Sequence, residues 1–480
     1  MLTKNSDMID KTNYIKGLIK LLLIVFVIWL LSIVAANIIK PIKKKSVSNS
    51  FKEEISGVEY ESDKVSTESV LSIDTNEDAL LWRLRMIGNA KESITMATFD
   101  LRMDESGLDV ISALYDAAER GVKVKVLIDG IYEPLYLRDD TFYAFCSHEN
   151  VEVKLYNPIT FKGIYNINYR MHDKYLMVDE CMYLLGGRNT TDTFWGELRG
   201  GSNIDRELLV YNSEEGKGDS FLQLENYFEQ IWKEDCVQTV SESVDEDILL
   251  EEKERFLNRY EDLLEEYEDF SEFDDWHGNT WEANKITLIA NETEATNKEP
   301  RVLYMIGQLA DGADEVIIQT PYAICNKYMY SVLHDMGEHA DLKIMLNAVE
   351  RGSNPWGCTD YLNNKEKILD TGTDIYELMN EYAVHTKTVL IDNNLSIVGS
   401  FNLDMRSTYL DTELMLVVDS EPLNAYIRQQ FEQYKEKSVE VLSDGTETVG
   451  SMYQEKEMTA RKKVMYSILR VIIRPFRYLL

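Results

Sequence analysis

Two stretches of the chain carry the same chemically capable residues at the same spacing, His-x-Lys-x4-Asp. The six residues are His172, Lys174, Asp179, His385, Lys387 and Asp392. An imidazole can act as a nucleophile or move a proton, and a lysine ammonium can neutralise the oxygens of an anionic group. Each copy therefore suits nucleophilic or acid–base chemistry on an anionic group. Because the spacing recurs, chance is a poor explanation, and we treat both copies as functional.

A short apolar run follows each His and Lys and predicts the strand that positions them. Residues 175–178 and 388–391 are rich in Leu, Met, Val and Ile. A polar turn and a second apolar run, 182–185 or 395–398, come next. Side chains two positions apart point to the same face of a strand, so each His emerges beside its Lys. Each motif is therefore expected to form a β-hairpin with one polar cluster.

Small and amide residues end each predicted hairpin, in the runs Gly-Gly-Arg-Asn and Gly-Ser-Phe-Asn. The small pair lets the backbone approach a ligand closely, and the asparagine then returns beside the His and Lys. Its amide adds a neutral hydrogen-bond donor to the cluster. The predicted substrate-binding residues are Gly187, Asn189, Ser400 and Asn402.

Both motifs resemble the paired catalytic motifs of the phospholipase D superfamily. The second, with GSFNLDMRS and then Asp411-Thr412-Glu413, is especially similar to that of bacterial cardiolipin synthases. The resemblance covers residues 76–440 and implies an α/β fold, with two phospholipase D-like α/β/α half-domains related by a pseudo-twofold axis. It also implies a reaction through a phosphohistidine that uses no cofactor and no metal.

The resemblance assigns roles within one joint site. His172 is the expected nucleophile and His385 the expected acid and base, although near symmetry makes this assignment reversible. The family pairs each His with a downstream acid that fixes its tautomer, and the shared D-x-E-L runs identify Glu207 and Glu413. The two motif lysines would stabilise charge in the transition state. We expect the two motif aspartates to hold the hairpin turns.

The composition disfavours nucleic acid as a partner. The 480 residues carry a formal charge of -34, which would repel a polyanion over most of the surface. The five cysteines are scattered without C-x-x-C spacing, so neither a disulfide framework nor a zinc site is predicted.

Both ends of the chain suggest a membrane. Residues 21–39 are almost purely apolar and close to the ~20 residues that cross a bilayer as a helix. A retained anchor is expected, with a cleaved signal peptide as the alternative, and balanced lysines leave the orientation open. Residues 459–480 are basic and amphipathic, and predict an interfacial helix for anionic lipid. The alternative is a tail that docks on the acidic surface of the protein itself.

An internal repeat organises the rest of the chain. Both halves run helix, strand, helix, strand before the catalytic hairpin, which predicts a largely parallel sheet covered by helices. The acidic stretch 241–276 is expected to be a connecting helix, with a lid over the site as the alternative. The predicted segments are an N-terminal tail (1–20), a transmembrane helix (21–39), a linker (40–75), repeat 1 (76–235), an acidic connection (236–298), repeat 2 (299–440) and a basic tail (441–480).

These features predict a membrane-anchored phosphatidyltransferase that acts on phospholipid, with cardiolipin synthesis from phosphatidylglycerol as the leading activity. Three alternatives stay open: a hydrolytic phospholipase D, a nuclease of the superfamily, and an inactive membrane scaffold.

Overall fold

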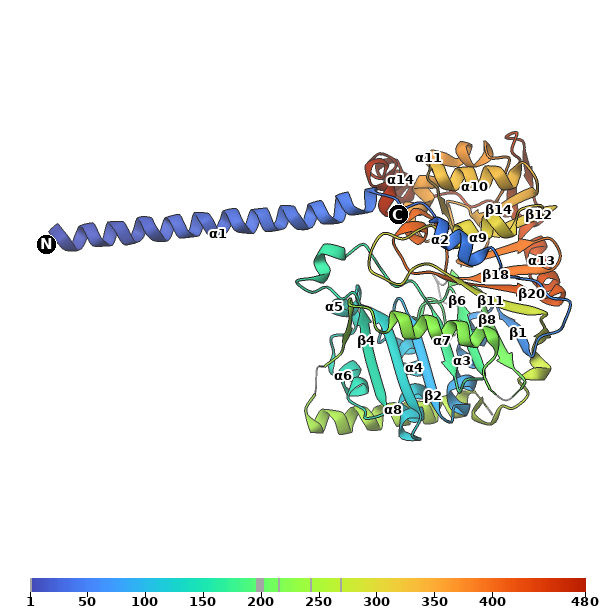
Figure 1. The fold of residues 1–480 in the computed structure, drawn as a ribbon, viewed down its shortest axis with the longest axis horizontal. Coiled ribbons are helices and arrows are strands. Elements are labelled where there is room, and N and C mark those ends of the chain that lie inside the picture. Colours follow the sequence, from blue (N-terminus) through green and yellow to red (C-terminus); the bar gives the residue numbers. More distant parts are fainter. Residues whose placement is uncertain (1, 196–202, 215, 242–243, 268–269) are drawn as a thin grey trace.

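The computed structural model describes residues 2–195, 203–214, 216–241, 244–267 and 270–480. One long helix, α1 (Leu2–Ile42), extends away from a two-part body (Figure 1). An 18-residue window of its segment Tyr14–Ile42 has a mean hydropathy of 2.9, and the segment is long and apolar enough to cross a membrane. A signal sequence near the N-terminus has the same properties.

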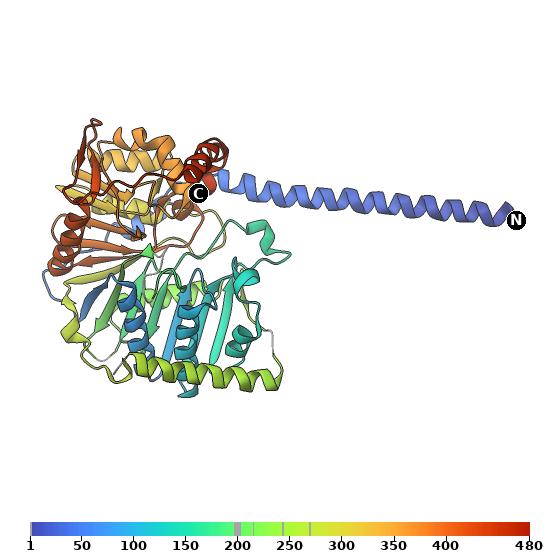
Figure 2. The ribbon, with the colours of Figure 1, turned by 180° about the vertical axis from the view of Figure 1, so that it is seen from behind.

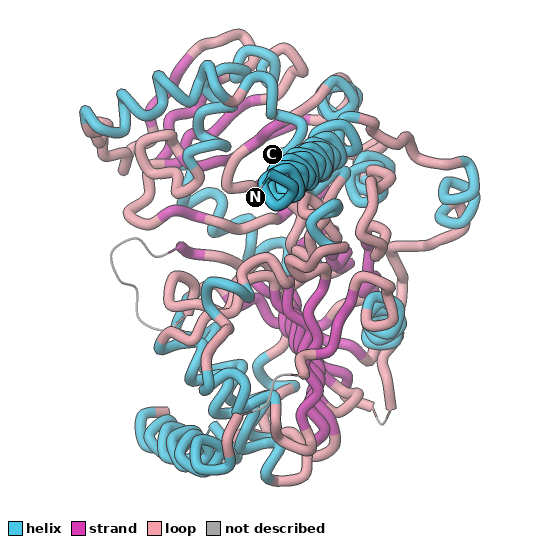
Figure 3. Tube along the Cα trace, turned by 90° about the vertical axis from the view of Figure 1, so that its left-hand side faces the viewer, coloured by secondary structure: helices cyan, strands magenta, loops and turns pink. Residues whose placement is uncertain are grey.

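The first half of the body is built on a nine-stranded sheet that lies between helices (Figure 3). Its strands, in spatial order, are β10 (Trp281–Glu282), β1 (Glu68–Ile73), β8 (Glu207–Asn212), β6 (Met182–Gly186), β5 (Tyr175–Val178), β2 (Ser93–Thr98), β3 (Lys123–Asp129), β4 (Val151–Tyr156) and β9 (Val237–Thr239). Its helices are α3 (Asn76–Asn89), α4 (Glu105–Glu119), α5 (Glu133–Tyr136), α6 (Asp140–Cys146), α7 (Asp219–Ile231) and α8 (Glu246–Glu266).

The second half repeats this arrangement above the first (Figures 1 and 2). Its strands, in spatial order, are β11 (Lys285–Ala290), β20 (Leu414–Asp419), β18 (Leu395–Gly399), β17 (Thr388–Ile391), β12 (Glu315–Gln319), β14 (Asp341–Asn347), β15 (Asp374–Leu378), β21 (Ser438–Val441) and β22 (Glu447–Val449). Its helices are α9 (Arg301–Leu309), α10 (Lys327–Gly337), α11 (Pro355–Leu369), α12 (Met405–Tyr409), α13 (Glu421–Lys435), α14 (Ala460–Ile472) and the 3-10 helix η4 (Arg474–Leu479). The predicted α/β fold of two repeated halves is confirmed.

The sheets are mixed, so the prediction of largely parallel sheets is wrong. Among the strands that the structure describes, β2, β3 and β4 pair in parallel in the first sheet and β12, β14 and β15 in the second, and the others pair antiparallel. The catalytic hairpins β5–β6 and β17–β18 join these parallel strands antiparallel. Helical crossovers explain the parallel part, whereas a hairpin must return antiparallel.

The predicted linker 40–75 contains regular structure. It forms the short helix α2 (Asn49–Ile55), whose Phe51 is buried, and strand β1. β1 pairs along its whole length with β8 and so belongs to the first half, whereas α2 lies against α9 of the second half, where Arg301 contacts the Phe51 ring. The β1 run Glu-Ser-Val-Leu-Ser-Ile alternates too weakly to identify it as a strand without its partner.

The acidic stretch between the halves forms α8, which lies along the lower edge of the body (Figures 1 and 2). Phe256, Tyr260 and Leu263 of α8 are buried in the core of the first half. Arg259 adds an ion pair of 2.7 Å with Asp109 on α4. These contacts favour the connecting helix over the lid.

Candidate active site

The two motifs meet where the halves of the body join. Strand β7 (Asn203–Ile204) of the first half pairs in parallel with β16 (Ala383–Val384) of the second. The backbone N–H of His385 donates to the carbonyl of Ile204 at 2.6 Å. On the other side, the N–H of His172 donates to the carbonyl of Thr412 at 3.3 Å. Each histidine is thus fixed by backbone from the opposite half.

Each imidazole also contacts a buried carboxylate from the opposite half. His172 Nδ1 lies 3.0 Å from Glu413 Oε1, and His385 Nδ1 lies 2.7 Å from Asp205 Oδ2. Both carboxylates are fully enclosed, with no exposed side-chain surface. A hydrogen bond to Nδ1 selects one tautomer and aims Nε2 at a reacting atom. The two crossed pairs therefore form one joint site.

Asp205, and not the expected Glu207, is the partner of His385. Glu207 is fully buried and is bound by two guanidiniums. Arg83 Nη1 donates to its Oε2 at 2.8 Å, and Arg188 Nη1 lies 3.3 Å from the same oxygen. The Arg83 guanidinium in turn stacks on Trp195, 4.1 Å from the ring centroid. Glu207 is therefore held as a structural ion pair behind the site.

The residues that follow the two return strands explain the difference between the halves. Ser400 Oγ donates to Glu413, which holds that carboxylate under His172. The matching residue in the first half is Gly187, which has no hydroxyl. A Cβ at Gly187 would lie 2.5 Å from Asp205 Oδ2, so the glycine leaves the space that Asp205 fills. We propose that Gly187 and Ser400, predicted to bind substrate, position the two carboxylates.

Two buried lysines complete the positive part of the site. Lys174 and Lys387 are 2% and 1% exposed. Burial lowers the pKa of Lys174 to about 7 and that of Lys387 to about 8. Lys387 Nζ lies 3.5 Å from Asp205 Oδ2. A bound phosphodiester anion would favour the charged form of both lysines.

The two acid–histidine pairs differ in charge. Burial raises the pKa of Glu413 to about 8. Burial also opposes ionisation of Asp205, but Lys387 and His385 outweigh it and lower the pKa of Asp205 to about 2. Burial and Lys174 hold the pKa of His172 well below its ordinary range. Burial and Lys387 lower the pKa of His385 to about 4, an effect that Asp205 opposes.

The motif aspartates lie at the turns of the hairpins, away from the histidines. Asp179 accepts hydrogen bonds from the backbone N–H groups of Lys91, Glu92 and Ser93 at 2.6, 2.8 and 2.9 Å. Asp392 accepts hydrogen bonds from the N–H groups of Asp314 and Glu315, the residue before β12 and its first residue, both at 3.0 Å. Each aspartate thus ties its hairpin turn to the start of the neighbouring strand.

The two predicted asparagines present amides to the site. Within the described residues, the side-chain oxygens of Asn189 and Asn402 are buried and make no hydrogen bond. Asn402 also lines a pocket of about 540 Å³ that reaches His172. An unpaired buried amide oxygen is costly, and we propose that both asparagine side chains find their partners in a bound substrate.

Two aromatic residues that the sequence did not identify flank the histidines. The rings of Phe99 and Phe194 meet His172 and His385 edge to face, each at 5.1 Å between centroids. They exclude water from one side of each imidazole. Neither phenylalanine belongs to a motif, and only the fold brings them there.

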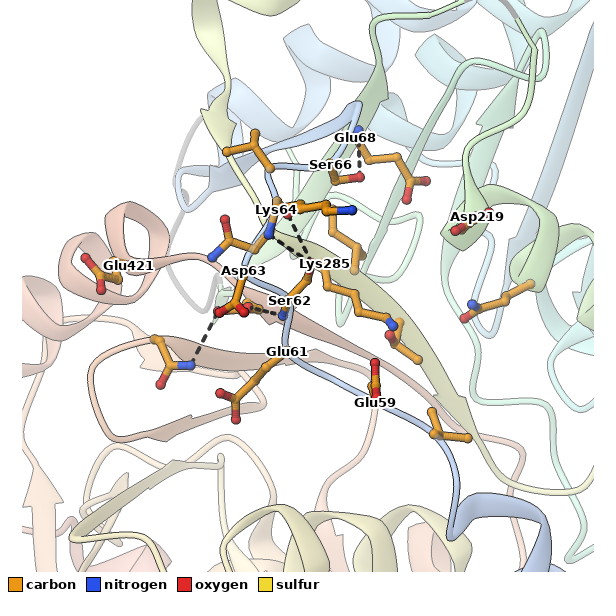
Figure 4. A pocket seen from close by; sticks show the side chains of 18 of the residues that line it. Glu59, Glu61, Ser62, Asp63, Lys64, Ser66, Glu68, Asp219, Lys285 and Glu421 are labelled. Atoms are coloured by element: carbon orange, nitrogen blue, oxygen red, sulfur yellow. Dashed lines mark hydrogen bonds between the residues drawn. The ribbon is translucent and has the colours of Figure 1, made fainter.

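A larger cavity, of about 1300 Å³, lies apart from the histidines (Figure 4). Its wall includes the turn residues 392–394 of the second hairpin. Several carboxylates line this wall, among them Glu59, Glu61 and Glu68 (Figure 4). An acidic wall repels a phosphate, so this cavity is not the candidate site.

The fold and the crossed pairs define a protein with two phospholipase D-like halves. The family model described as "Cardiolipin synthase, PLD-like domain" matches residues 84–232 and 305–435, and the chain belongs to this family.

The individual proteins that resemble this chain have low sequence identity to it. An uncharacterised protein of Helicobacter pylori strain 26695 is 24% identical over 412 residues, covering 77% of this chain and 80% of that protein. Cardiolipin synthase C of Escherichia coli K12 is 24% identical over 405 residues, covering 75% and 83%. The crystal structure of phosphatidylserine synthase from Haemophilus influenzae Rd KW20 superposes with a TM-score of 0.62 at 13% identity, covering 90% of this chain and all of that one. This last likeness concerns the fold alone.

Proposed function

We propose that the protein is a membrane-anchored phosphatidyltransferase that works through a phosphohistidine, with cardiolipin formation from two phosphatidylglycerol molecules as its leading reaction. The observation that carries the proposal is the pair of crossed contacts, His172 with Glu413 and His385 with Asp205. They join two imidazoles and two lysines in one buried site, which is what metal-independent cleavage of a phosphodiester requires.

In the first step, Nε2 of His172 attacks the phosphorus of a phosphatidyl donor. A P–N bond forms, and the P–O bond to the head-group alcohol breaks. His385, as an imidazolium, gives its proton to the departing oxygen. Lys174 and Lys387 balance the charge on the phosphoryl oxygens.

In the second step, His385 removes the proton from an incoming hydroxyl. The hydroxyl oxygen attacks phosphorus, the P–N bond breaks, and His172 returns to its neutral form. An acceptor hydroxyl from a second phosphatidylglycerol gives cardiolipin, with glycerol as the first leaving group. Water as acceptor gives phosphatidic acid, which is the hydrolytic alternative.

The charge difference between the pairs supports these roles. Asp205 is an ionised carboxylate, so it opposes the lowering of the pKa of His385, and a bound phosphodiester anion further favours the imidazolium that an acid needs. Glu413 has a pKa raised to about 8 by burial and is largely uncharged near neutral pH. It therefore favours the neutral His172 that a nucleophile needs. Asp179, Asp392 and Glu207 take no direct part in either step.

Phospholipid is the preferred substrate class for two reasons. Cardiolipin synthase C of E. coli is similar over 75% of the chain, and the α1 helix can hold the body at a bilayer. The charge of -34 opposes nucleic acid.

The test is incubation of the full-length protein with labelled phosphatidylglycerol in mixed micelles, followed by separation of the lipids. Cardiolipin and glycerol, both lost in His172→Ala and His385→Ala, would support the transferase. Phosphatidic acid alone would replace it with a hydrolase. Absence of turnover with every phospholipid would refute the proposal.

A further inference from the structure

We propose that the face of the body from which α1 leaves is a surface that rests in the lipid bilayer. Two segments build it: the loop between β4 and β5 (158–168) and the tail formed by α14 and η4. Both border the pocket that reaches His172. The structure assigns to this membrane-facing surface the task of presenting that pocket to lipid.

The loop 158–168 is bound to the apolar part of α1. Asn37 Nδ2 on α1 donates to the carbonyl of Ile164 at 2.7 Å. Trp29 of α1 stacks on Phe161 with ring centroids 5.7 Å apart. Both α1 residues lie within the span Tyr14–Ile42. If α1 crosses a bilayer, this loop must enter the interface with it.

The loop also carries apolar side chains that the body leaves uncovered. Phe161 is 74% exposed and Ile159 is 38% exposed. The loop projects from the body on the same side as α1 (Figure 1). Aromatic and aliphatic side chains at this place are suited to the region of the lipid head groups.

The tail helix α14 has one face on the protein and one face uncovered. Tyr466 and Ile473 are buried, and the Tyr466 hydroxyl donates to the carbonyl of Val349 at 3.2 Å. The uncovered large apolar residues of α14 and η4 are Val464, Met465, Ile468, Val471, Ile472 and Phe476. The segment therefore docks on the body, as one of its two predicted alternatives states, and it still presents the apolar face that an interfacial helix needs.

The tail lies beside the body end of α1 and across its direction. Lys44 Nζ, just after α1, donates to the carbonyl of Tyr478 at 3.1 Å. α14 appears nearly end-on in the view that shows α1 along its length (Figure 1). A helix that lies in the interface plane has this relation to a helix that crosses the bilayer.

The charge of the tail indicates that the bilayer contains anionic lipid. The segment 459–480 contains six Lys and Arg residues and no acid. Some of these cations serve the fold, since Arg477 pairs with Asp360. Arg461, Lys463 and Arg474 stay exposed. In a chain of charge -34, this cationic patch beside an apolar face complements anionic phospholipid.

The surface also borders the entrance to the site. Ile167 of the loop and Leu480 of the tail line the 540 Å³ pocket together with His172. Tyr132 and Trp356 add aromatic walls. A lipid can therefore bring its phosphate to His172 while its acyl chains stay in the bilayer. Only this last step rests on the proposed function.

The test uses the full-length protein in vesicles of phosphatidylcholine and phosphatidylglycerol with radiolabelled acyl chains. Photoreactive p-benzoylphenylalanine is placed at Val464 on α14, at Phe161, or at Leu250 on α8. Val464 and Leu250 are matched, since they are 61% and 62% exposed. The same probe at Val25 of α1 reports that the protein is inserted.

Irradiation is expected to label Val464 and Phe161 with lipid, as it labels Val25, and to leave Leu250 at background. Labelling of Val25 with Val464 and Phe161 at the level of Leu250 would overturn the proposal. So would crosslinks from Val464 to a second protein chain in place of lipid. The readout needs no turnover and is repeated in His172→Ala, so a failed activity assay leaves this proposal intact.

Discussion

The sharpest prediction separates Asp205 from Glu207, two carboxylates in one D-x-E-L run. Asp205→Asn keeps the shape of the side chain but removes the charge that faces His385 at 2.7 Å. Glu207→Gln removes the charge that Arg83 and Arg188 surround. The proposed mechanism gives the first carboxylate a role in catalysis, whereas the second lies in a buried ion pair, so the two variants should fail in opposite ways.

The magnitudes follow from the contacts. Loss of the orienting carboxylate from an acid–histidine pair lowers kcat by about 10⁴. The pKa of Asp205 falls from 3.8 to about 2 in the folded protein, which corresponds to about 2 kcal/mol of stability. Because this folded pKa is depressed, the stabilisation is present above about pH 4 and is lost as pH falls towards 2. Asp205→Asn should lose about the same amount at neutral pH.

Glu207→Gln has a different profile. It leaves two buried guanidiniums without a counter-charge, and breaking a buried ion pair from one side destabilises a protein by about 3–5 kcal/mol. His385 keeps its partner, so kcat should stay within about tenfold wherever the variant is folded.

The assay is steady-state turnover of phosphatidylglycerol in mixed micelles, beside urea unfolding in the same detergent. We expect Asp205→Asn to be folded and nearly inactive, and Glu207→Gln to be active but less stable. Loss of kcat in Glu207→Gln with full activity in Asp205→Asn would refute the assignment of the crossed pairs.

Three further predictions follow from the same contacts. Ser400→Ala removes the hydroxyl that holds Glu413 and should lower kcat about tenfold with about 1 kcal/mol of lost stability; equal activity of variant and parent would contradict the positioning role. Gly187→Ala places a methyl group 2.5 Å from Asp205 Oδ2, so its kcat should fall nearly as far as that of Asp205→Asn. Steady-state kinetics would measure this loss, and circular dichroism would show that the secondary structure is unchanged. Because the pKa of Lys174 is about 7 and that of Lys387 about 8, both lysines lose charge as pH rises, and kcat/KM should decline from pH 7 to about 9; a flat profile would show that neither charge is needed.

Most of the fold that was predicted correctly from the sequence was predicted from the repeated motif. The apolar runs after His172 and His385 became strands β5 and β17, because a buried strand has a strong local signature. Strand β1 was not predicted from the sequence, because its place depends on pairing with β8, more than 130 positions later. The mixed direction of the sheets was missed for the same reason: local pattern identifies a strand but not its neighbour.

The sequence predicted the motif residues of the site correctly. It did not predict which carboxylate contacts each histidine. His172, Lys174, His385 and Lys387 gather at the junction of the halves, as two matched motifs imply. The choice between Asp205 and Glu207 depends on what surrounds each carboxylate. Arg83 comes from a distant helix, and its contact with Glu207 exists only in the fold.

The most direct test of the central claim is to trap the covalent intermediate. Full-length protein is mixed with phosphatidylglycerol labelled at phosphorus, quenched in alkali within milliseconds, digested, and analysed by mass spectrometry. One joint site with His172 as nucleophile predicts an acid-labile phosphorus label on the peptide that contains His172, and none in His172→Ala. A label on the peptide that contains His385, or turnover without any labelled histidine, would contradict the account.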